Sequence, residues 1–462
     1  MEKKLRLVIN KYFPFYSGSK HIRTQELLNE SFVIKEYIDL SNIDINRLSQ
    51  YLSYCTDIEA IEIDELEGII KLFKKKMLSN YFDSIGVVME QIGKIEKWGY
   101  FKIESLTSIG FINRNILELE GMAEKQDLQS EAIAFIEYME RLCSLETGNI
   151  VNVTLEDITK ENSLFFESMN TYLLDNSTVQ ALELSSLLNS DKIIVPHEYI
   201  YYASKINSDL IVESGSSNGC AVGNSYEDAV IRGGLEVIER SDFMDFWFND
   251  AKIVELELDM TANQLRFLIN ELERKSYQVR FFYVNCRDNS SIKTVWCLAE
   301  SKNKKNYVYS MSGLASDFSI EVAVSKSFFE MKRTLDIWNT SDYYIKMKKF
   351  KQLSITNNIL DNILIYFSNY ERKNQFSVML DGIEKVRITE IKNCESRFYI
   401  NKYLELLETV KQYYKNIYVE DMTNKPLADL GLVCTKVLIT GCTDIEFKSK
   451  KNKYNFDYQP IA

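Results

Sequence analysis

An α+β fold with mixed sheets is predicted by three features of the 462-residue sequence. The front of the chain is rich in helical patterns, whereas the remainder mixes helical and strand patterns. Residues 277–285 and 294–299 are rich in β-branched and aromatic side chains, and residues 286–290 between them suit a turn, so the two segments read as paired strands. Two further segments carry the same helical pattern, Glu-x-x-Glu-Arg. With 45% hydrophobic residues and only 4 prolines, the chain can bury a large core in two or three modules.

Residues 1–78 are expected to form a small N-terminal docking module. Patches of acidic and apolar residues alternate along this part of the sequence and end in the apolar run at residues 70–73. Nothing in it indicates chemistry, so its role is left open.

A polar loop rich in glycine, serine and asparagine at residues 216–225 leads directly into a helix predicted from residue 226 onward. Small residues allow the backbone to approach a ligand closely. Asn224 and Ser225 stand where a helix N-cap would leave backbone N–H groups pointing outward, and such groups bind phosphates. The segment therefore predicts a nucleotide site.

Four charged side chains fall on one stripe of this helix at about 100° per residue. They are Asp228, Arg232, Glu236 and Glu239. Apolar residues occupy much of the remaining surface, so we expect the stripe to face a cleft while the other sides are buried. A half-buried row of three acids needs a cation, because desolvated carboxylates repel one another.

The pattern Glu-x-x-Glu-Arg occurs twice. An isolated copy would suit a solvated helix face, but residues 130–141 repeat the pattern of the central helix, so two helices can set four carboxylates face to face. That many oxygen ligands suits Mg²⁺ shared with a triphosphate, and the two arginines would clamp phosphates. The repeated residues are Glu137, Glu140 and Arg141 in the first copy, and Glu236, Glu239 and Arg240 in the second.

The composition argues against several other classes of protein. A formal net charge of −12 disfavours nonspecific nucleic-acid binding, which requires concentrated Lys and Arg. No stretch has the length and apolarity of a signal sequence or a membrane span, so a cytoplasmic protein is expected. The 8 cysteines lack Cys-x-x-Cys spacing and only 2 histidines occur, which disfavours zinc and iron–sulfur sites.

The central loop and helix resemble the YcaO family, ATP-using enzymes that activate peptide backbone amides. Similar runs occur around residues 81–87, 192–196, 311–315 and 430–441, and the third of these leads into a helix containing Glu330. The resemblance covers roughly residues 79–445. It implies a YcaO-like ATP-binding domain over residues 79–462, after the docking module at residues 1–78.

The resemblance also implies the ligands of the cofactors ATP and Mg²⁺, while no catalytic residue is assigned. Four carboxylates would hold Mg²⁺: Glu137, Glu140, Glu236 and Glu239. The nucleotide would be contacted by Asn224, Asp228 and Arg240, with Arg141 as a second phosphate clamp.

The function implied by the resemblance is that of a cyclodehydratase in bacteriocin-like natural product biosynthesis. It would form thiazoline or oxazoline rings from Cys, Ser or Thr of a ribosomally made precursor peptide, by phosphorylating the backbone amide. Such members usually depend on a leader-binding partner related to ubiquitin-activating enzymes, and a flavin dehydrogenase can follow. A homodimer is compatible with the resemblance; nucleic-acid and membrane partners are not expected.

The sequence departs from the family pattern in several places. Residues 121–125 lack the usual Gly-Lys-Gly-like element, Ile133 stands where Ser is common, Asp228 where Glu is common, and Arg333 where Gln is frequent. The last eight residues hold one proline instead of the alternating prolines of azoline-forming members.

Two alternatives therefore stay open. One is thioamide or amidine formation by the same activation, and the other is a non-catalytic scaffold with this fold. The tail is either a frayed end or a divergent segment docked by Phe456, Tyr458 and Ile461.

Overall fold

The structure is a computed structural model. It describes the backbone of strands between residues 4 and 125, most of residues 130–339 and 373–443, and scattered residues at 363–367 and 452–460. The chain divides into two compact units, Met1–Leu142 and Cys143–Ala462. Most of the polar segment at residues 340–372 lies outside the described residues.

The first unit is built on a five-stranded antiparallel sheet with neighbouring strands in sequence order. The described residues before 126 are strands, so the expectation of a helix-rich front was wrong there. The sequence alternates apolar and polar residues at positions 61–64, a period of two that favours a strand. The predicted boundary after residue 78 falls between two paired strands. The elements are β1 (Lys4–Arg6), β2 (Tyr37–Asp39), β3 (Ile61–Glu65), β4 (Gly68–Lys76), β5 (Val87–Trp98), β6 (Phe101–Ile112), β7 (Asn115–Lys125) and α4 (Ser130–Cys143).

The described residues of the second unit form three sheets, with strand orders β10-β9-β8, β11-β18-β17 and β15-β14-β13-β12-β16. The mixture of sheets and helices confirms the predicted α+β class. The strands are β8 (Val151–Val153), β9 (Val179–Ser185), β10 (Lys192–Pro196), β11 (Cys220–Gly223), β12 (Ile253–Glu257), β13 (Tyr277–Val284), β14 (Lys293–Ser301), β15 (Ser310–Asp317), β16 (Lys385–Arg387), β17 (Asn416–Asp421) and β18 (Val433–Thr440).

The strand pair predicted from the sequence is confirmed. Strands β13 and β14 pair antiparallel, with Tyr277 opposite Ser301 and Val284 opposite Thr294. Strand β14 also pairs with β15, which leads into the third predicted helix. In the same sheet β12 and β16 run parallel.

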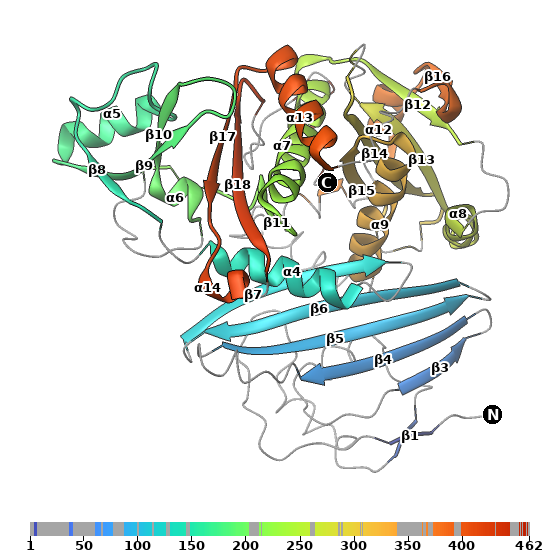
Figure 1. Ribbon diagram of the computed structural model, residues 1–462. Coiled ribbons are helices and arrows are strands. Elements are labelled where there is room, and N and C mark those ends of the chain that lie inside the picture. Colours follow the sequence, from blue (N-terminus) through green and yellow to red (C-terminus); the bar gives the residue numbers. More distant parts are fainter. Residues whose placement is uncertain are drawn as a thin grey trace. The chain divides into compact units, whose positions relative to one another are not determined.

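Helix α7 lies between two of these sheets. It contacts β11 and β18 on one side and β14 and β15 on the other (Figure 1). Apolar side chains such as Val230, Ile238 and Phe243 are at most 1% exposed, and each such burial contributes roughly 1.5–3 kcal/mol. The helices of this unit are α5 (Phe166–Asp175), α6 (His197–Ile200), α7 (Tyr226–Asn249), α8 (Gln264–Arg274), α9 (Ile320–Trp338), α12 (Lys373–Leu380), the 3₁₀ helix η3 (Ile388–Glu390), α13 (Tyr399–Tyr413) and α14 (Lys425–Asp429).

The ends of α7 are fixed by residues that the sequence places there. The hydroxyl of Ser225, the N-cap, accepts a hydrogen bond from the backbone N–H of Asp228 at 3.2 Å. The Asp228 carboxylate in turn accepts one from the Asn224 N–H at 3.0 Å, a variant of the capping box. At the other end Asp250 adopts a left-handed conformation, which closes the helix.

Two glycines allow the loop before β11 to approach α7. A Cβ atom on Gly233 would lie 2.5 Å from the Gly219 carbonyl oxygen. Gly219 itself has φ +80°, and a Cβ atom there would lie 2.3 Å from the Val437 oxygen. Loop, helix and strand β18 are therefore in backbone contact at this point.

The C-terminal tail is docked by an aromatic side chain. Phe456 is 1% exposed, and its ring centroid lies 4.9 Å from that of Trp247 on α7 and 5.3 Å from that of Phe376 on α12. The Asn452 side-chain oxygen accepts hydrogen bonds from the N–H groups of residues 454 and 456, which shapes the turn. Of the two alternatives for the tail, these contacts favour a docked segment at Phe456 and at Tyr458, which packs on Tyr366 at 5.2 Å; Ile461 lies outside the described residues.

We expect Phe456→Ala to lower the free energy of unfolding by about 3–5 kcal/mol, because it removes a large buried side chain from a packed cluster. Urea denaturation followed by circular dichroism measures the change. Val378→Ala is the control, since Val378 is 71% exposed and its truncation should change stability by less than about 0.5 kcal/mol. An equally small change for Phe456→Ala would contradict the docked tail.

Candidate active site

Glu236 is held by two groups on α7 and on the loop before β11. One carboxylate oxygen accepts hydrogen bonds from Nε and the terminal nitrogen of Arg240, at 3.3 and 3.2 Å. The other accepts the backbone N–H of Gly219 at 3.2 Å. Its side chain is 28% exposed, so the carboxylate is fixed and still reachable from solvent.

Glu239 lies one turn further along the same helix and contacts the neighbouring sheet. Its carboxylate accepts the backbone N–H of Ser316 on β15 at 2.8 Å. The two adjacent glutamates of α7 are thus each anchored by a backbone donor from a different sheet. The predicted stripe that faces a cleft stays a prediction.

Glu330 on α9 is the third acid of the cluster. Burial raises the pKa of Glu239 well above its usual value, and the negative charge of Glu330 raises it further. Burial also raises the pKa of Glu330; the nearby Arg333 and Arg240 oppose this shift, and the charge of Glu236 adds to it. Carboxylates from two helices therefore interact electrostatically in a partly desolvated place.

Arg240 is the cation that the three acids share. Burial alone would lower its pKa, but the charges of Glu236, Glu239 and Glu330 outweigh that effect and raise it. The guanidinium is fully charged in any case, so its role is to offset part of the repulsion. With Arg333 beside Glu330, two arginines therefore lie near the three acids.

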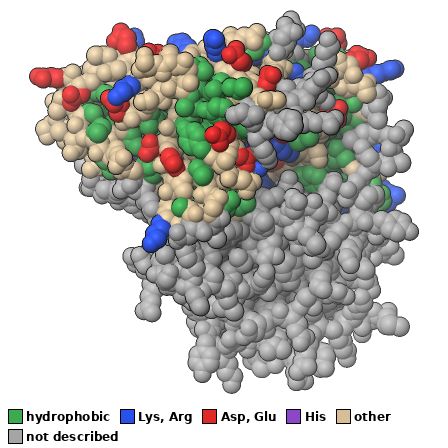
Figure 2. Space-filling model, in the orientation of Figure 1, with side chains coloured by type: hydrophobic (Ala, Val, Ile, Leu, Met, Phe, Trp, Pro, Cys, Tyr) green, Lys and Arg blue, Asp and Glu red, His purple; other side chains and the backbone are tan. Residues whose placement is uncertain are grey.

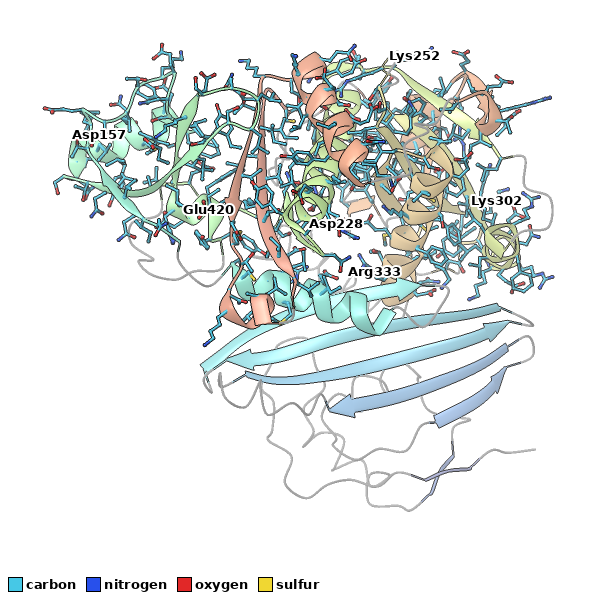
Figure 3. All side chains as sticks on the ribbon, viewed as in Figure 1. Asp157, Asp228, Lys252, Lys302, Arg333 and Glu420 are labelled. Atoms are coloured by element: carbon cyan, nitrogen blue, oxygen red, sulfur yellow. The ribbon has the colours of Figure 1, made fainter. Side chains whose placement is uncertain are left out.

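The predicted nucleotide contacts Asn224 and Asp228 lie at the beginning of α7, where Figure 3 labels Asp228. Asn224 is exposed. The Asp228 side chain is only 4% exposed. One of its oxygens accepts a hydrogen bond from Nε of Arg232 at 3.1 Å, and the other accepts the one from the Asn224 N–H at the start of the helix. The structure thus gives Asp228 a local structural role, and its contact with a nucleotide stays a prediction.

The first copy of Glu-x-x-Glu-Arg lies on α4, in the first compact unit. Arg141 forms an ion pair with Glu137 one turn away, at 2.8 Å, and Glu140 is half-buried. The helix is confirmed at the predicted place. Because α4 is described with the first unit, the predicted meeting of its glutamates with those of α7 stays a prediction.

A buried hydrogen-bond network continues from Glu239 into the protein. The Ser316 hydroxyl lies 2.7 Å from that of Thr294, which donates to Asp242 at 2.6 Å. Asp242 also forms an ion pair with Arg287 at 3.0 Å. Asp242 was not among the predicted site residues, and Glu330 was named only as part of a helix that follows a run similar to the family. A signal for Asp242 was its position three residues after Glu239.

The donor set fits Mg²⁺ shared with a phosphate. Among the described residues, no three His, Cys, Asp or Glu side chains form a ready-made metal cage. Mg²⁺ is usually bound through a few carboxylates, water and substrate phosphates, so a small carboxylate cluster of this kind suits it. Glu236, Glu239 and Glu330 are the described residues that would hold it.

Charged side chains are spread over the surface of the described part. Figure 2 shows acidic and basic groups scattered on one face, with hydrophobic side chains gathered in its middle. No helix within the described residues has the length and apolarity needed to cross a membrane.

Comparison with known proteins identifies one family. Residues 124–443 match the family model described as YcaO cyclodehydratase, ATP- and Mg²⁺-binding. Comparison with curated proteins gives no match.

Solved structures share the fold at low sequence identity. YcaO from Methanopyrus kandleri bound with AMPPCP and Mg²⁺ is similar with a TM-score of 0.55 and 18% identity, over 79% of this chain and 88% of that one. A heterocyclase in complex with substrate and cofactor gives 0.57 and 14%, over 80% of this chain and 50% of that one. The Escherichia coli microcin synthetase McbBCD complex with pro-MccB17 bound gives 0.52 and 15%, over 79% and 90%. At these identities the likeness concerns the fold.

We expect Glu239→Gln to stabilise the metal-free protein at neutral pH. A carboxyl whose pKa is raised by folding opposes folding wherever the unfolded chain would ionise it, and each tenfold gain in proton affinity costs about 1.4 kcal/mol. The gain in stability should be largest above the raised pKa and should vanish as the pH falls to 4.5, the usual value. Thermal denaturation at several pH values measures it. A loss of stability at neutral pH would contradict the repulsion between the carboxylates.

Proposed function

Because the chain belongs to the YcaO cyclodehydratase family, whose cofactors are ATP and Mg²⁺, we propose that it is an ATP-dependent enzyme acting on a ribosomally made precursor peptide. In this proposal it converts Cys, Ser or Thr residues of that peptide into thiazoline or oxazoline rings, as part of bacteriocin-like natural product biosynthesis.

The observation that carries the proposal is the cluster of Glu236, Glu239 and Glu330 around Arg240. Its members come from α7 and α9, both within residues 124–443, and their charges raise the pKa of Arg240 against the effect of burial. Desolvated carboxylates lower the stability of a protein unless a bound cation or another partner compensates their charge. A scaffold without catalysis would have no physical need for this cluster, so the observation favours an enzyme.

In the proposed reaction the substrate side chain attacks the preceding backbone carbonyl and adds to it. The oxygen that results receives the γ-phosphoryl group of ATP, which releases ADP. The addition closes the ring. Elimination of that phosphate, with loss of the proton from the former amide nitrogen, then forms the C=N bond, so the net change is the loss of one water from the peptide for each ATP used. Amide oxygen is a poor leaving group, and phosphorylation removes that obstacle.

The protein's own contribution is position and electrostatics. Mg²⁺ bound at the carboxylates would neutralise charge on the phosphates. Arg240 is held by Glu236 beside this place and would orient a phosphate oxygen through its planar donors. We retain Glu137, Glu140, Arg141, Asn224 and Asp228 as further predicted ligands of the metal or the nucleotide.

Partner proteins belong to the same proposal. The microcin synthetase structure is a complex of several subunits with a peptide bound, which supports a precursor peptide and a leader-binding partner here. A partner related to ubiquitin-activating enzymes, a flavin dehydrogenase acting afterwards, a homodimer and a cytoplasmic location are parts of the proposal that await tests.

Calorimetric titration with AMPPCP in the presence and absence of Mg²⁺ tests the cofactor site. We expect binding to depend on Mg²⁺ and to weaken by at least about 100-fold in Glu236→Gln and Glu330→Gln, because each removes a charged ligand. Glu183→Gln is the control; that carboxylate is 49% exposed and pairs with Lys192 on the neighbouring strand. Unchanged affinity in the first two variants would contradict the site.

Mass spectrometry of a precursor peptide incubated with the protein, its partner, ATP and Mg²⁺ tests the reaction. The proposal predicts a loss of one water per modified residue. A heavier product with sulfur in place of oxygen would indicate thioamide formation instead. No change in mass, despite nucleotide binding, would contradict the proposed chemistry.

A further inference from the structure

Lys436 is a buried cation outside the glutamate cluster. It lies on β18 opposite Cys220 of β11, and it is 1% exposed. Among the described residues no carboxylate forms an ion pair with it; its partners are two carbonyl oxygens and two aromatic rings. Burying an ammonium group costs free energy unless its hydrogen bonds are satisfied. The backbone around Lys436 must therefore keep its carbonyl oxygens within reach of the ammonium.

The Lys436 ammonium organises the loop before β11. It donates to the carbonyl oxygens of Ser216 at 2.6 Å and Asn218 at 2.7 Å. It also lies 5.8 Å from the ring centroid of Tyr199 and 5.6 Å from that of Tyr202, within the range of cation–π attraction. The side chain thus fixes two of the carbonyl groups of the polar loop.

One peptide group connects this ammonium to the glutamate cluster. The carbonyl of Asn218 and the N–H of Gly219 belong to the same planar peptide unit, in which they point in opposite directions. The oxygen accepts from Lys436, and the N–H donates to Glu236 at 3.2 Å. A hydrogen bond to the oxygen polarises the peptide and strengthens its N–H as a donor.

We infer that Lys436 is a positioning residue for Glu236, acting through the peptide between Asn218 and Gly219. The ammonium holds the peptide plane so that its N–H meets one carboxylate oxygen, while Arg240 binds the other. Glu236 is then fixed before any ligand arrives. As a role in cofactor binding, this inference rests on the proposed function.

Hydrogen exchange in the metal-free protein tests the link between Lys436 and the peptide. In Lys436→Met, which keeps the length of the side chain without its charge, the Gly219 amide should exchange about tenfold faster or more. The Ser316 amide, which donates a hydrogen bond to Glu239, should keep its exchange rate. Lys293→Met is the matched control, because Lys293 is also buried on a strand and donates to the carbonyl of Ser290.

Unchanged exchange at Gly219 in Lys436→Met, or equal acceleration at Gly219 in both lysine variants, would overturn the inference. If Lys436→Met does not fold, Lys436→Gln takes its place with the same expectations, since its side chain is polar but uncharged and shorter than that of lysine. Hydrogen exchange in these lysine variants requires no nucleotide. It therefore tests the link between Lys436 and Gly219 independently of the proposed function.

A double-mutant cycle then measures the effect on cofactor binding, with AMPPCP and Mg²⁺ as the probe. Lys436→Met should weaken binding about 10–100-fold, as loss of an indirect support of a metal ligand does. The loss should largely disappear in the Glu236→Gln background and persist in Glu239→Gln. Equal losses in both backgrounds would overturn the inference, because they would show a general structural effect. Failure of the wild-type protein to bind the probe would instead contradict the proposed function.

Discussion

Repulsion among the carboxylates of α7 and α9 is the constraint on which the site depends. Burial raises the pKa of both Glu239 and Glu330; the charge of Glu330 adds to the shift at Glu239, and the charge of Glu236 adds to the shift at Glu330. Arg240 carries one positive charge among Glu236, Glu239 and Glu330, and so offsets part of their charge. The remaining repulsion favours a bound cation, and the protein must hold the acids together until that cation binds.

The fold holds them through backbone donors from two different sheets. The loop before β11 supplies the Gly219 N–H to Glu236, and β15 supplies the Ser316 N–H to Glu239. Helix α7 can receive both because it lies between the sheets, and Gly233 allows a close approach to the loop before β11. Lys436 binds the carbonyl of the peptide that supplies the first donor, and the Thr294 hydroxyl contacts the side-chain hydroxyl of Ser316, whose N–H is the second.

Much of this site could be predicted from the sequence, because local patterns determine it. The cap at Ser225, the helix after it and the glutamates at a spacing of three all follow from helical periodicity and turn chemistry. The strands β13 and β14 follow from their β-branched and aromatic residues in the same way.

The parts that the sequence analysis missed depend on contacts between distant segments. Glu330 joins the cluster only because α9 packs on β14 and β15, and Lys436 supports the loop only because β18 pairs with β11. The resemblance pointed to the helix of Glu330 but not to its place in the cluster, and Lys436 lies in no local pattern that distinguishes it from a surface charge. The front of the chain was expected to be helical because its short acidic and apolar patches show only a weak periodicity of hydrophobic residues. Pairing between strands determined its conformation instead.

Proton release on cofactor binding tests the central claim most directly. If Glu239 and Glu330 have raised pKa values, they hold protons in the metal-free protein at pH values where ordinary glutamates are ionised, and Mg²⁺ must displace them. Calorimetry of AMPPCP and Mg²⁺ binding, in buffers of different ionisation enthalpy at several pH values above 4.5, counts the protons released. The account predicts release that declines as the pH rises and is reduced in Glu239→Gln. Binding without proton release at every pH would contradict it.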